Sequence, residues 1–173
     1  MVTGGNQGAH VINLAVEGCL DKLVKLANVI HQTGDSKFRD HERLEVRQSD
    51  GYIVMKWIPN MAELMRQADL VVSRAGINTL SELAYLGKPA LVIPYPYLYK
   101  NEQYKNAKYF EKLGLVRILP QSKLNSENLL KAIKSCLNDL NHIKQSAKKA
   151  KAVIIPDAAK RLALETVLLG GRD

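Results

Sequence analysis

The sequence lacks the features that mark membrane-spanning and disulfide-stabilised proteins. No apolar run approaches the ~20 residues that a membrane helix needs, and the longest, residues 89–94, has the length of a buried strand. The only cysteines, Cys19 and Cys136, form no CxxC pair and have no pair of histidines nearby, so neither a metal site nor a disulfide framework is expected. Glycine is reached at position 4, before any apolar leader segment could form. We therefore expect an intracellular chain with two reduced thiols.

Aromatic residues are scarce, at 6%, and they are not interleaved with basic ones. Nucleic acid is therefore not an expected partner, although the net charge is +8. The positive charge is concentrated late in the chain, in Lys144, Lys148, Lys149, Lys151, Lys160 and Arg161. A solvated helix face is the favoured interpretation, and contact with an anionic membrane surface is the alternative.

The pattern of hydrophobic residues predicts an α/β fold. Short apolar runs alternate with amphipathic stretches, which is typical of parallel strands joined by crossover helices. Strands are expected at residues 1–3, 28–31, 52–57, 69–73, 90–93 and 115–119. Helices are expected at residues 9–26, 36–47, 61–67, 78–86, 101–113, 126–137, 142–151 and 157–169. This order predicts one Rossmann-like domain over residues 1–173, with a doubly wound, parallel, six-stranded sheet. Because the first strand is unusually short, we expect the chain to begin where a longer protein would already be under way.

A glycine-rich turn joins the first strand to the first helix. It reads Gly4, Gly5, Asn6, Gln7, Gly8. Glycines allow the backbone to turn its N–H groups toward one point, and the start of a helix adds partial positive charge, so the turn suits a diphosphate. It lacks the spacing of the dinucleotide fingerprint and the lysine of a P-loop, which leaves open a tight turn without a ligand.

A second strand-to-helix turn contains Arg74 and Gly76. Its N–H groups are expected at the carboxyl edge of the sheet, where open α/β folds bind ligands. We expect Asn78 to cap the following helix. Glu82, one turn further along, is suited to accept hydrogen bonds from a ribose diol, and the alternative is a solvated carboxylate favoured by the helix dipole.

Two further segments carry polar side chains of interest. Gln103 and Asn106 are three residues apart and share a helix face, and their amides could bind sugar hydroxyls or simply begin a polar helix. His31 ends a strand beside a turn, a position where a structural histidine is more common than a catalytic one.

Taken together, the ordered set of segments resembles the C-terminal domain of glycosyltransferase family 28. The segments are residues 4–9, 31–34, 68–76, 79–84, 87–90, 94–96 and 103–107. The resemblance covers nearly the whole chain, and it implies the C-terminal half of a two-domain GT-B glycosyltransferase, the half that binds the nucleotide sugar.

The resemblance also implies roles for individual residues. The turn from Gly4 to Gly8, with Asn6, would face the donor diphosphate, and the backbone of Ile58 beside Trp57 would contact uracil. Glu82 would hold the ribose hydroxyls. The remaining implied contacts are Ile77, Asn78 and Thr79 on the phosphate and ribose side, and Gln103 and Asn106 on the N-acetylglucosamine hydroxyls.

The implied activity is the inverting transfer of N-acetylglucosamine from UDP-N-acetylglucosamine to a lipid-linked acceptor, lipid I, in peptidoglycan synthesis. It requires no cofactor and no metal, and it takes place in the cytoplasm or at the inner face of the plasma membrane. The catalytic base and the acceptor site belong to an N-terminal half that this chain lacks, so no catalytic residue is expected here. The apolar positions of the last helix, Leu162, Leu164, Val167 and Leu168, would then lack a partner.

Alternatives remain open at this point. A relative could use another UDP-sugar, or another lipid acceptor such as diacylglycerol. The chain could also be a non-catalytic or truncated donor-binding module.

Overall fold

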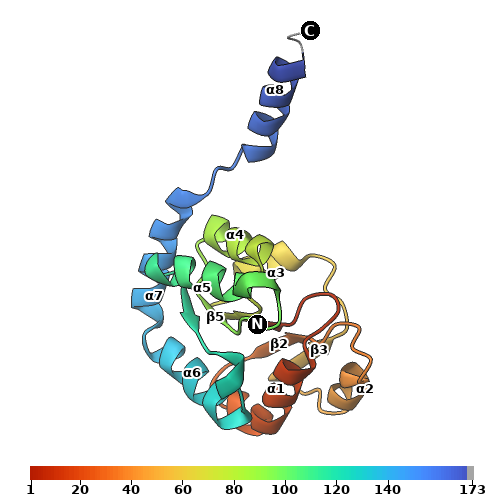
Figure 1. The fold of residues 1–173 in the computed structure, drawn as a ribbon. Helices are drawn as coiled ribbons and strands as arrows, with labels where there is room; N and C mark the ends of the chain where they lie inside the picture. The colour runs from red at the N-terminus through yellow and green to blue at the C-terminus, as the bar shows by residue number, and fades with distance from the viewer. Residues whose placement is uncertain (171–173) are drawn as a thin grey trace.

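Six short parallel strands form the centre of the protein, in the order β3-β2-β1-β4-β5-β6, in a computed structural model that describes residues 1–170 (Figure 1). The last three residues of the expected domain lie outside the described range. The strands are β1 (Val2–Thr3), β2 (Val29–Gln32), β3 (Tyr52–Met55), β4 (Val71–Ser73), β5 (Ala90–Val92) and β6 (Val116–Ile118). The expected doubly wound parallel sheet is confirmed.

Helices cover both faces of this sheet. They are α1 (His10–Leu23), α2 (Asp40–Glu45), α3 (Met61–Gln67), α4 (Ile77–Leu86), α5 (Glu102–Lys112), α6 (Ser126–Asn138), α7 (Leu140–Ala150) and α8 (Ala158–Gly170). Short 3-10 turns are η1 (Tyr99–Asn101), η2 (Gln121–Lys123) and η3 (Lys151–Val153). No helix within residues 1–170 is both long and apolar enough to cross a membrane.

Side chains that alternate along each strand build two cores. In β4, Val72 belongs to the core beneath α1 and α6, and its neighbour Val71 belongs to the core beneath α4 and α5. A strand buried on both faces has no polar alternation, which is why these strands read as continuous apolar runs. Because all six strands are parallel, their carboxyl ends lie at one edge of the sheet, and the two cores hold the sheet in place.

The prediction of a helix over residues 36–47 is wrong in length, because the regular helix α2 covers only Asp40–Glu45. Arg39 has a φ of 55°, in the left-handed region, which cannot belong to an α-helix. Asp40 is drawn into the interior, and this tertiary contact decides where the helix begins.

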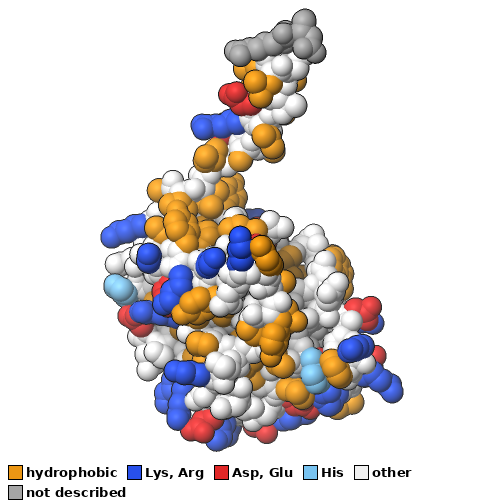
Figure 2. Space-filling view, viewed as in Figure 1, with side chains coloured by type: hydrophobic (Ala, Val, Ile, Leu, Met, Phe, Trp, Pro, Cys, Tyr) orange, Lys and Arg blue, Asp and Glu red, His pale blue; other side chains and the backbone are white. Residues whose placement is uncertain are grey.

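The final helix α8 projects away from the rest of the protein (Figure 1). None of its residues is buried, and the apolar side chains Leu162, Leu164, Val167 and Leu168 are 54–72% exposed. Figure 2 shows hydrophobic side chains along this projection. The expectation that these positions lack a partner is confirmed for the described residues.

Candidate functional site

The candidate site is a cleft of about 480 Å³ at the carboxyl edge of the sheet. It lies where β1 and β4 are neighbours, with β2 on one side and β5 on the other. The chain leaves these two strands toward opposite halves of the sheet, so this is the topological switch point at which open α/β folds bind ligands. The two strand-to-helix turns singled out in the sequence therefore meet at one cleft.

The glycine turn forms one wall and is held tightly by its surroundings. Gly5 and Gly8 have φ values of 81° and 74°, in the left-handed region. A Cβ at Gly4 would lie 2.3 Å from the backbone nitrogen of Ala9. The hydroxyl of Thr3 accepts a hydrogen bond from the N–H of Gly5, at 3.0 Å. The turn delivers the chain into α1, which has no side-chain cap and no acid in its first turn, so its first N–H groups stay available to an anion.

The turn after β4 forms the opposite wall. Gly76 is the N-cap of α4, and the helix again begins with no side-chain cap and no acid in its first turn. The expectation that Asn78 caps α4 is wrong, since Asn78 lies inside the helix and is exposed. Two helices thus direct uncapped N-termini toward the same edge of the sheet, and both favour negative charge there.

Arg74 and Gln103 fix the geometry of the second turn. Arg74 donates from Nη1 to the carbonyl of Ile93 at 3.0 Å, and its guanidinium lies 5.4 Å from the ring centre of Tyr95. Burial lowers the pKa of Arg74, although a guanidinium remains charged at neutral pH. Gln103 Oε1 accepts hydrogen bonds from the N–H groups of Ala75, at 3.2 Å, and Tyr95, at 2.9 Å. The carbonyl end of Gln103 is therefore occupied by the fold, and its NH₂ group is the end left for a ligand.

The third wall follows β3 and is apolar. Trp57 is 53% exposed at the cleft, and Ile58 beside it is buried. Met61, Ala62 and Met65 of α3 continue this wall. An exposed indole beside apolar side chains suits the flat face of a base.

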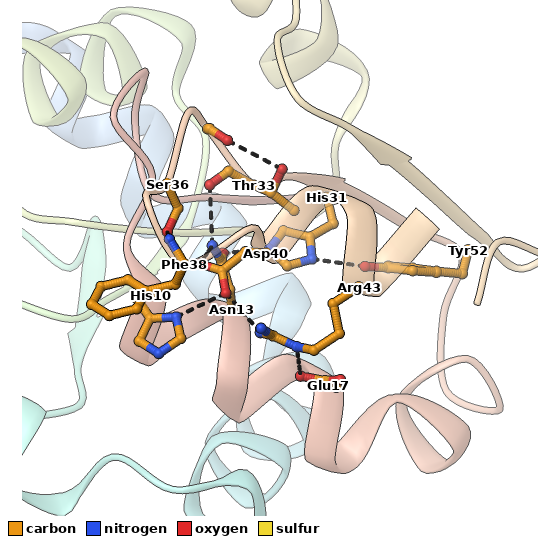
Figure 3. A network of polar contacts seen from close by, with 11 residues as sticks. His10, Asn13, Glu17, His31, Thr33, Ser36, Phe38, Asp40, Arg43 and Tyr52 are labelled. Atoms are coloured by element: carbon orange, nitrogen blue, oxygen red, sulfur yellow. Dashed lines mark hydrogen bonds and ion pairs between the residues drawn. The ribbon is translucent and has the colours of Figure 1, made fainter. Parts of the chain in front are cut away.

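A polar network supports the glycine turn from behind (Figure 3). Asn13 of α1 donates to the carbonyl of Thr33, at 3.1 Å, and to Asp40 Oδ2, at 2.8 Å. Gly8 packs so closely on this segment that a Cβ would lie 2.1 Å from the Thr33 carbonyl oxygen. The loop after β2 and the glycine turn are therefore a single packed unit.

His31 is a structural member of this network, as the favoured interpretation predicts. It is fully buried, with Nε2 3.0 Å from Asn13 Oδ1 and Nδ1 2.9 Å from the hydroxyl of Tyr52. Because Asn13 Oδ1 can only accept, Nε2 carries the proton and Nδ1 accepts from Tyr52. Burial lowers the pKa of His31 to about 3, so the ring is neutral at physiological pH.

Asp40 is the charged centre of the network, and sequence reasoning missed it. The carboxylate is fully buried and lies 2.8 Å from His10 Nδ1 and 2.6 Å from Arg43 Nη2. Burial alone would raise the pKa of Asp40, but hydrogen bonds from Asn13, Ser36, His10 and Arg43 outweigh it and hold the pKa below its usual value. Nothing in the sequence around Asp40 signals burial, since it sits in a polar stretch.

A larger cleft of about 520 Å³ lies at the opposite, amino edge of the sheet. It is lined by the ends of helices α1, α3 and α6, including Leu26, Ala68 and Leu137. Helix C-termini carry partial negative charge, so this cleft is unsuited to a phosphate.

The chain matches the glycosyltransferase family 28 C-terminal domain over residues 1–162. It belongs to this family. Among curated relatives it is 38% identical, over 164 residues, to the UDP-N-acetylglucosamine–N-acetylmuramyl-(pentapeptide) pyrophosphoryl-undecaprenol N-acetylglucosamine transferase of Gloeothece citriformis (strain PCC 7424). The match covers 94% of this chain and 44% of that protein. The enzyme of the same name from Desulforamulus reducens is 33% identical, over 91% of this chain and 45% of the relative. The chain thus spans less than half the length of these relatives.

Solved structures agree with the family assignment. The crystal structure of Acinetobacter baumannii MurG matches with a TM-score of 0.79 and 28% identity, over 93% of this chain and 47% of that one. CalG4, the calicheamicin glycosyltransferase, matches with a TM-score of 0.73 at 18% identity, over 99% of this chain and 43% of that one. The second likeness shows the fold alone.

Most of the site residues expected for a family 28 domain line the cleft. These are Gly4, Gly5, Asn6, Trp57, Ile58, Arg74, Gly76, Thr79, Glu82 and Gln103. Five expected residues do not line it: Gln7, Gly8, Ile77, Asn78 and Asn106. Gln7, Ile77 and Asn78 are exposed beside the cleft. Gly8 packs against the carbonyl of Thr33. The NH₂ group of Asn106 is buried without a hydrogen-bond partner in the described structure.

Proposed function

We propose that this chain is the donor-binding domain of an inverting glycosyltransferase and binds UDP-N-acetylglucosamine in the cleft between β1 and β4. The observation that carries the proposal is a single cleft in which the glycine turn before α1 and the uncapped start of α4 meet, together with Arg74 and Glu82. Backbone N–H groups, helix dipoles and a guanidinium all favour a diphosphate, and few other ligands need so many anion-stabilising groups.

The walls of the cleft give the donor an orientation. The base lies against Trp57 and the apolar side chains of α3, with the diphosphate between the glycine turn and the start of α4. Glu82 and Thr79, one turn apart on α4, face the ribose, where a carboxylate accepts from both hydroxyls of a diol. The free NH₂ group of Gln103 marks the sugar end.

In the proposed reaction an acceptor hydroxyl attacks the anomeric carbon, the bond to the diphosphate breaks, and UDP leaves. This chain contributes donor position and stabilisation of the charge that develops on the leaving diphosphate. The base that takes the proton of the acceptor hydroxyl is proposed to come from another half, because His31 of this chain is buried and neutral. The relatives' names give the acceptor as an N-acetylmuramyl-(pentapeptide) pyrophosphoryl-undecaprenol, and we propose this lipid-linked class for the present protein.

Calorimetric titration of the chain with UDP tests the proposal. Glu82→Gln is expected to weaken UDP binding about tenfold, since a hydrogen bond to a charged group contributes about 1.5–3 kcal/mol. The same change should weaken 2′-deoxy-UDP less than UDP, because only one of the two ribose hydroxyls remains to bond to Glu82. Glu111→Gln on α5, outside the cleft, is the matched control and should bind UDP like the unchanged chain.

Two outcomes would count against this function. A chain that binds ADP as tightly as UDP has no uracil site, and one that binds no UDP at millimolar concentration is no donor domain. Competition between UDP-N-acetylglucosamine and UDP-glucose decides the sugar, and tighter binding of UDP-glucose would favour a relative with another donor.

We further propose that the basic C-terminal region places the domain at an anionic membrane surface, on the inner face of the plasma membrane. Lys148, Lys149 and Lys151 are exposed at the end of α7. Replacing Lys148 and Lys149 by Gln should weaken binding to phosphatidylglycerol vesicles about tenfold or more, since each lysine near such a surface contributes about 1 kcal/mol. The same replacement of Lys22 and Lys25, exposed at the other end of the protein, is the control. Equal binding to neutral vesicles would contradict the proposal.

A further inference from the structure

A second cleft, of about 400 Å³, lies at the same carboxyl edge of the sheet, between the loops that follow β5 and β6. Its walls include Pro94 and Tyr97 from the first loop, Tyr104 from α5, and Pro120 from the second loop. None of the residues that line it is charged. The donor cleft described above does not use these side chains.

The segment from Pro94 to Tyr97 contacts both clefts, because Pro94 and Tyr97 line the second cleft and the N–H of Tyr95 bonds to Gln103 of the donor cleft. Gln103 lines the donor cleft, and the next residue, Tyr104, lines the second cleft. Arg74 of the donor cleft lies over the ring of Tyr95, whose centre is 5.4 Å from that of Tyr97 in an edge contact. A ligand in the second cleft would therefore lie close to the part of the donor that contacts Gln103.

The order of the strands places this cleft at a particular end of the donor. The wall proposed for the nucleotide base follows β3, and the two turns proposed for the diphosphate follow β1 and β4. Gln103, proposed for the sugar, bonds to the loop after β5. The second cleft continues this line to β6. It thus adjoins the sugar end of the donor, where the acceptor hydroxyl must arrive, rather than the uridine end.

The chemistry of the lining suits a sugar ring. Tyr97 and Tyr104 offer aromatic rings for the C–H face of a pyranose, and both are exposed, Tyr97 by 78% and Tyr104 by 37%. Asn101, Gln121 and Ser122 add neutral amide and hydroxyl groups, which donate as well as accept and so match hydroxyls and an N-acetyl group. A proline-rich peptide is the rival ligand for a tyrosine-lined groove. Its prolines have no N–H, however, so they could not donate hydrogen bonds to the acceptor oxygens that line this cleft.

We infer that this second cleft binds the sugar of the acceptor, a neutral N-acetylated pyranose, beside the sugar of the bound donor. The inference rests on the proposed function, since it takes the neighbouring cleft to hold a nucleotide sugar. It gives this half of the enzyme a part in acceptor recognition in addition to donor binding.

The test is a two-step titration of the isotope-labelled chain followed by amide NMR. UDP-N-acetylglucosamine is added first and should shift amides of residues 4–6 and Thr79. A soluble muramyl dipeptide is then added to the saturated chain and should shift the amides of Asn101, Tyr104, Gln121 and Ser122, with a saturable Kd of about 1–10 mM.

Variants separate the second cleft from the first. Tyr104→Ala and Gln121→Ala should each weaken the muramyl probe at least about fivefold while the Kd of the nucleotide sugar stays unchanged. Gln121 Oε1 is buried and has no hydrogen-bond partner within the described residues, so its loss costs the fold no hydrogen bond at this atom. Tyr109→Ala, on the same helix, 53% exposed and outside both clefts, should bind both ligands normally.

The outcomes are distinguishable. If the nucleotide sugar binds and the probe causes no saturable shift, the acceptor inference is wrong and the donor function stands. If the first titration itself causes no shift, the proposed function fails. If polyproline peptide shifts the residues of the second cleft and the muramyl probe does not, the cleft is a peptide groove and the inference is overturned.

Discussion

The two turns beside the donor cleft present the same kind of group but are held in different ways. The glycine turn after β1 is locked by packing, with Gly4 against Ala9 and Gly8 against the Thr33 carbonyl. The turn after β4 is open at Gly76, where a Cβ would meet nothing within 4 Å and φ is an ordinary −65°. The first turn is thus fixed by close backbone packing, and the second is held by the hydrogen bonds of Gln103. The difference teaches that the fold requires glycine in the first turn, whereas at Gly76 the fold leaves room for a side chain.

The largest effect is expected from Gly8→Ala. A Cβ there would lie 2.1 Å from the Thr33 oxygen, at a φ of 74°. The combined clash and strain should cost about 3 kcal/mol of unfolding free energy or more, measured by urea denaturation. Gly76→Ala is the control and should cost less than about 1 kcal/mol. Equal losses at both positions would remove the distinction between the turns.

The network behind the glycine turn should make stability depend on pH. In the folded chain the pKa of His31 is lowered to about 3, whereas an unfolded histidine titrates near pH 6.5, so between these values only the unfolded state binds this proton. Stability should therefore fall by about 1.4 kcal/mol for each unit by which pH drops within this window. His31→Gln should flatten the slope, and His142→Gln, on an exposed side chain, should not. An unchanged slope in His31→Gln would contradict a neutral, buried ring.

At the second turn, Gly76→Asp should separate stability from binding. The new carboxylate can accept the N–H groups at the start of α4, which stabilises the helix by up to about 1 kcal/mol. The same charge occupies the diphosphate position and should weaken UDP binding at least about tenfold by repulsion. Thermal unfolding and calorimetry on the same sample measure the two effects. Unchanged UDP affinity would show that α4 does not face the diphosphate.

The smallest effect is expected from Asn78→Ala. Asn78 does not cap α4 in the structure, so its removal should change stability by less than about 0.5 kcal/mol. Asn125→Ala is the matched control, because the Asn125 side chain accepts the N–H of Asn128 at 2.8 Å, and losing such a cap costs about 1 kcal/mol. Similar losses in the two variants would mean that the second turn also relies on a side-chain cap.

Sequence patterns were sufficient for the order of elements and for most of the cleft. Strand-to-helix turns at residues 4–8 and 73–76 could be located because glycines interrupt an apolar run just before a helical one. In a parallel sheet all such turns open on one edge, which the sequence could predict, but only the pairing of β1 with β4 makes these two turns neighbours. The apolar wall of Met61, Ala62 and Met65 was missed because these residues read as an ordinary helix face.

Other features depended on contacts that no local pattern encodes. Asp40 shortens its helix by entering the interior, where His10 and Asn13 of α1 and Arg43 of its own helix satisfy its charge. Asn106 shares a helix face with Gln103, but the NH₂ end of its amide is buried and Asn106 does not line the donor cleft. Gln103 itself was expected to bind a ligand with either end of its amide, and the fold occupies the carbonyl end.

The amino-acid sequence by itself determined the alternation of strands and helices, and with it the edge of the sheet where anion-binding turns gather. Such features follow from local periodicity and from the backbone freedom of glycine. Only the tertiary structure decided which glycines are locked, which histidine is neutral, and that a second cleft follows the first along the sheet. Those properties come from burial and from atoms brought together across the chain, and burial is set by the whole packing rather than by any one segment.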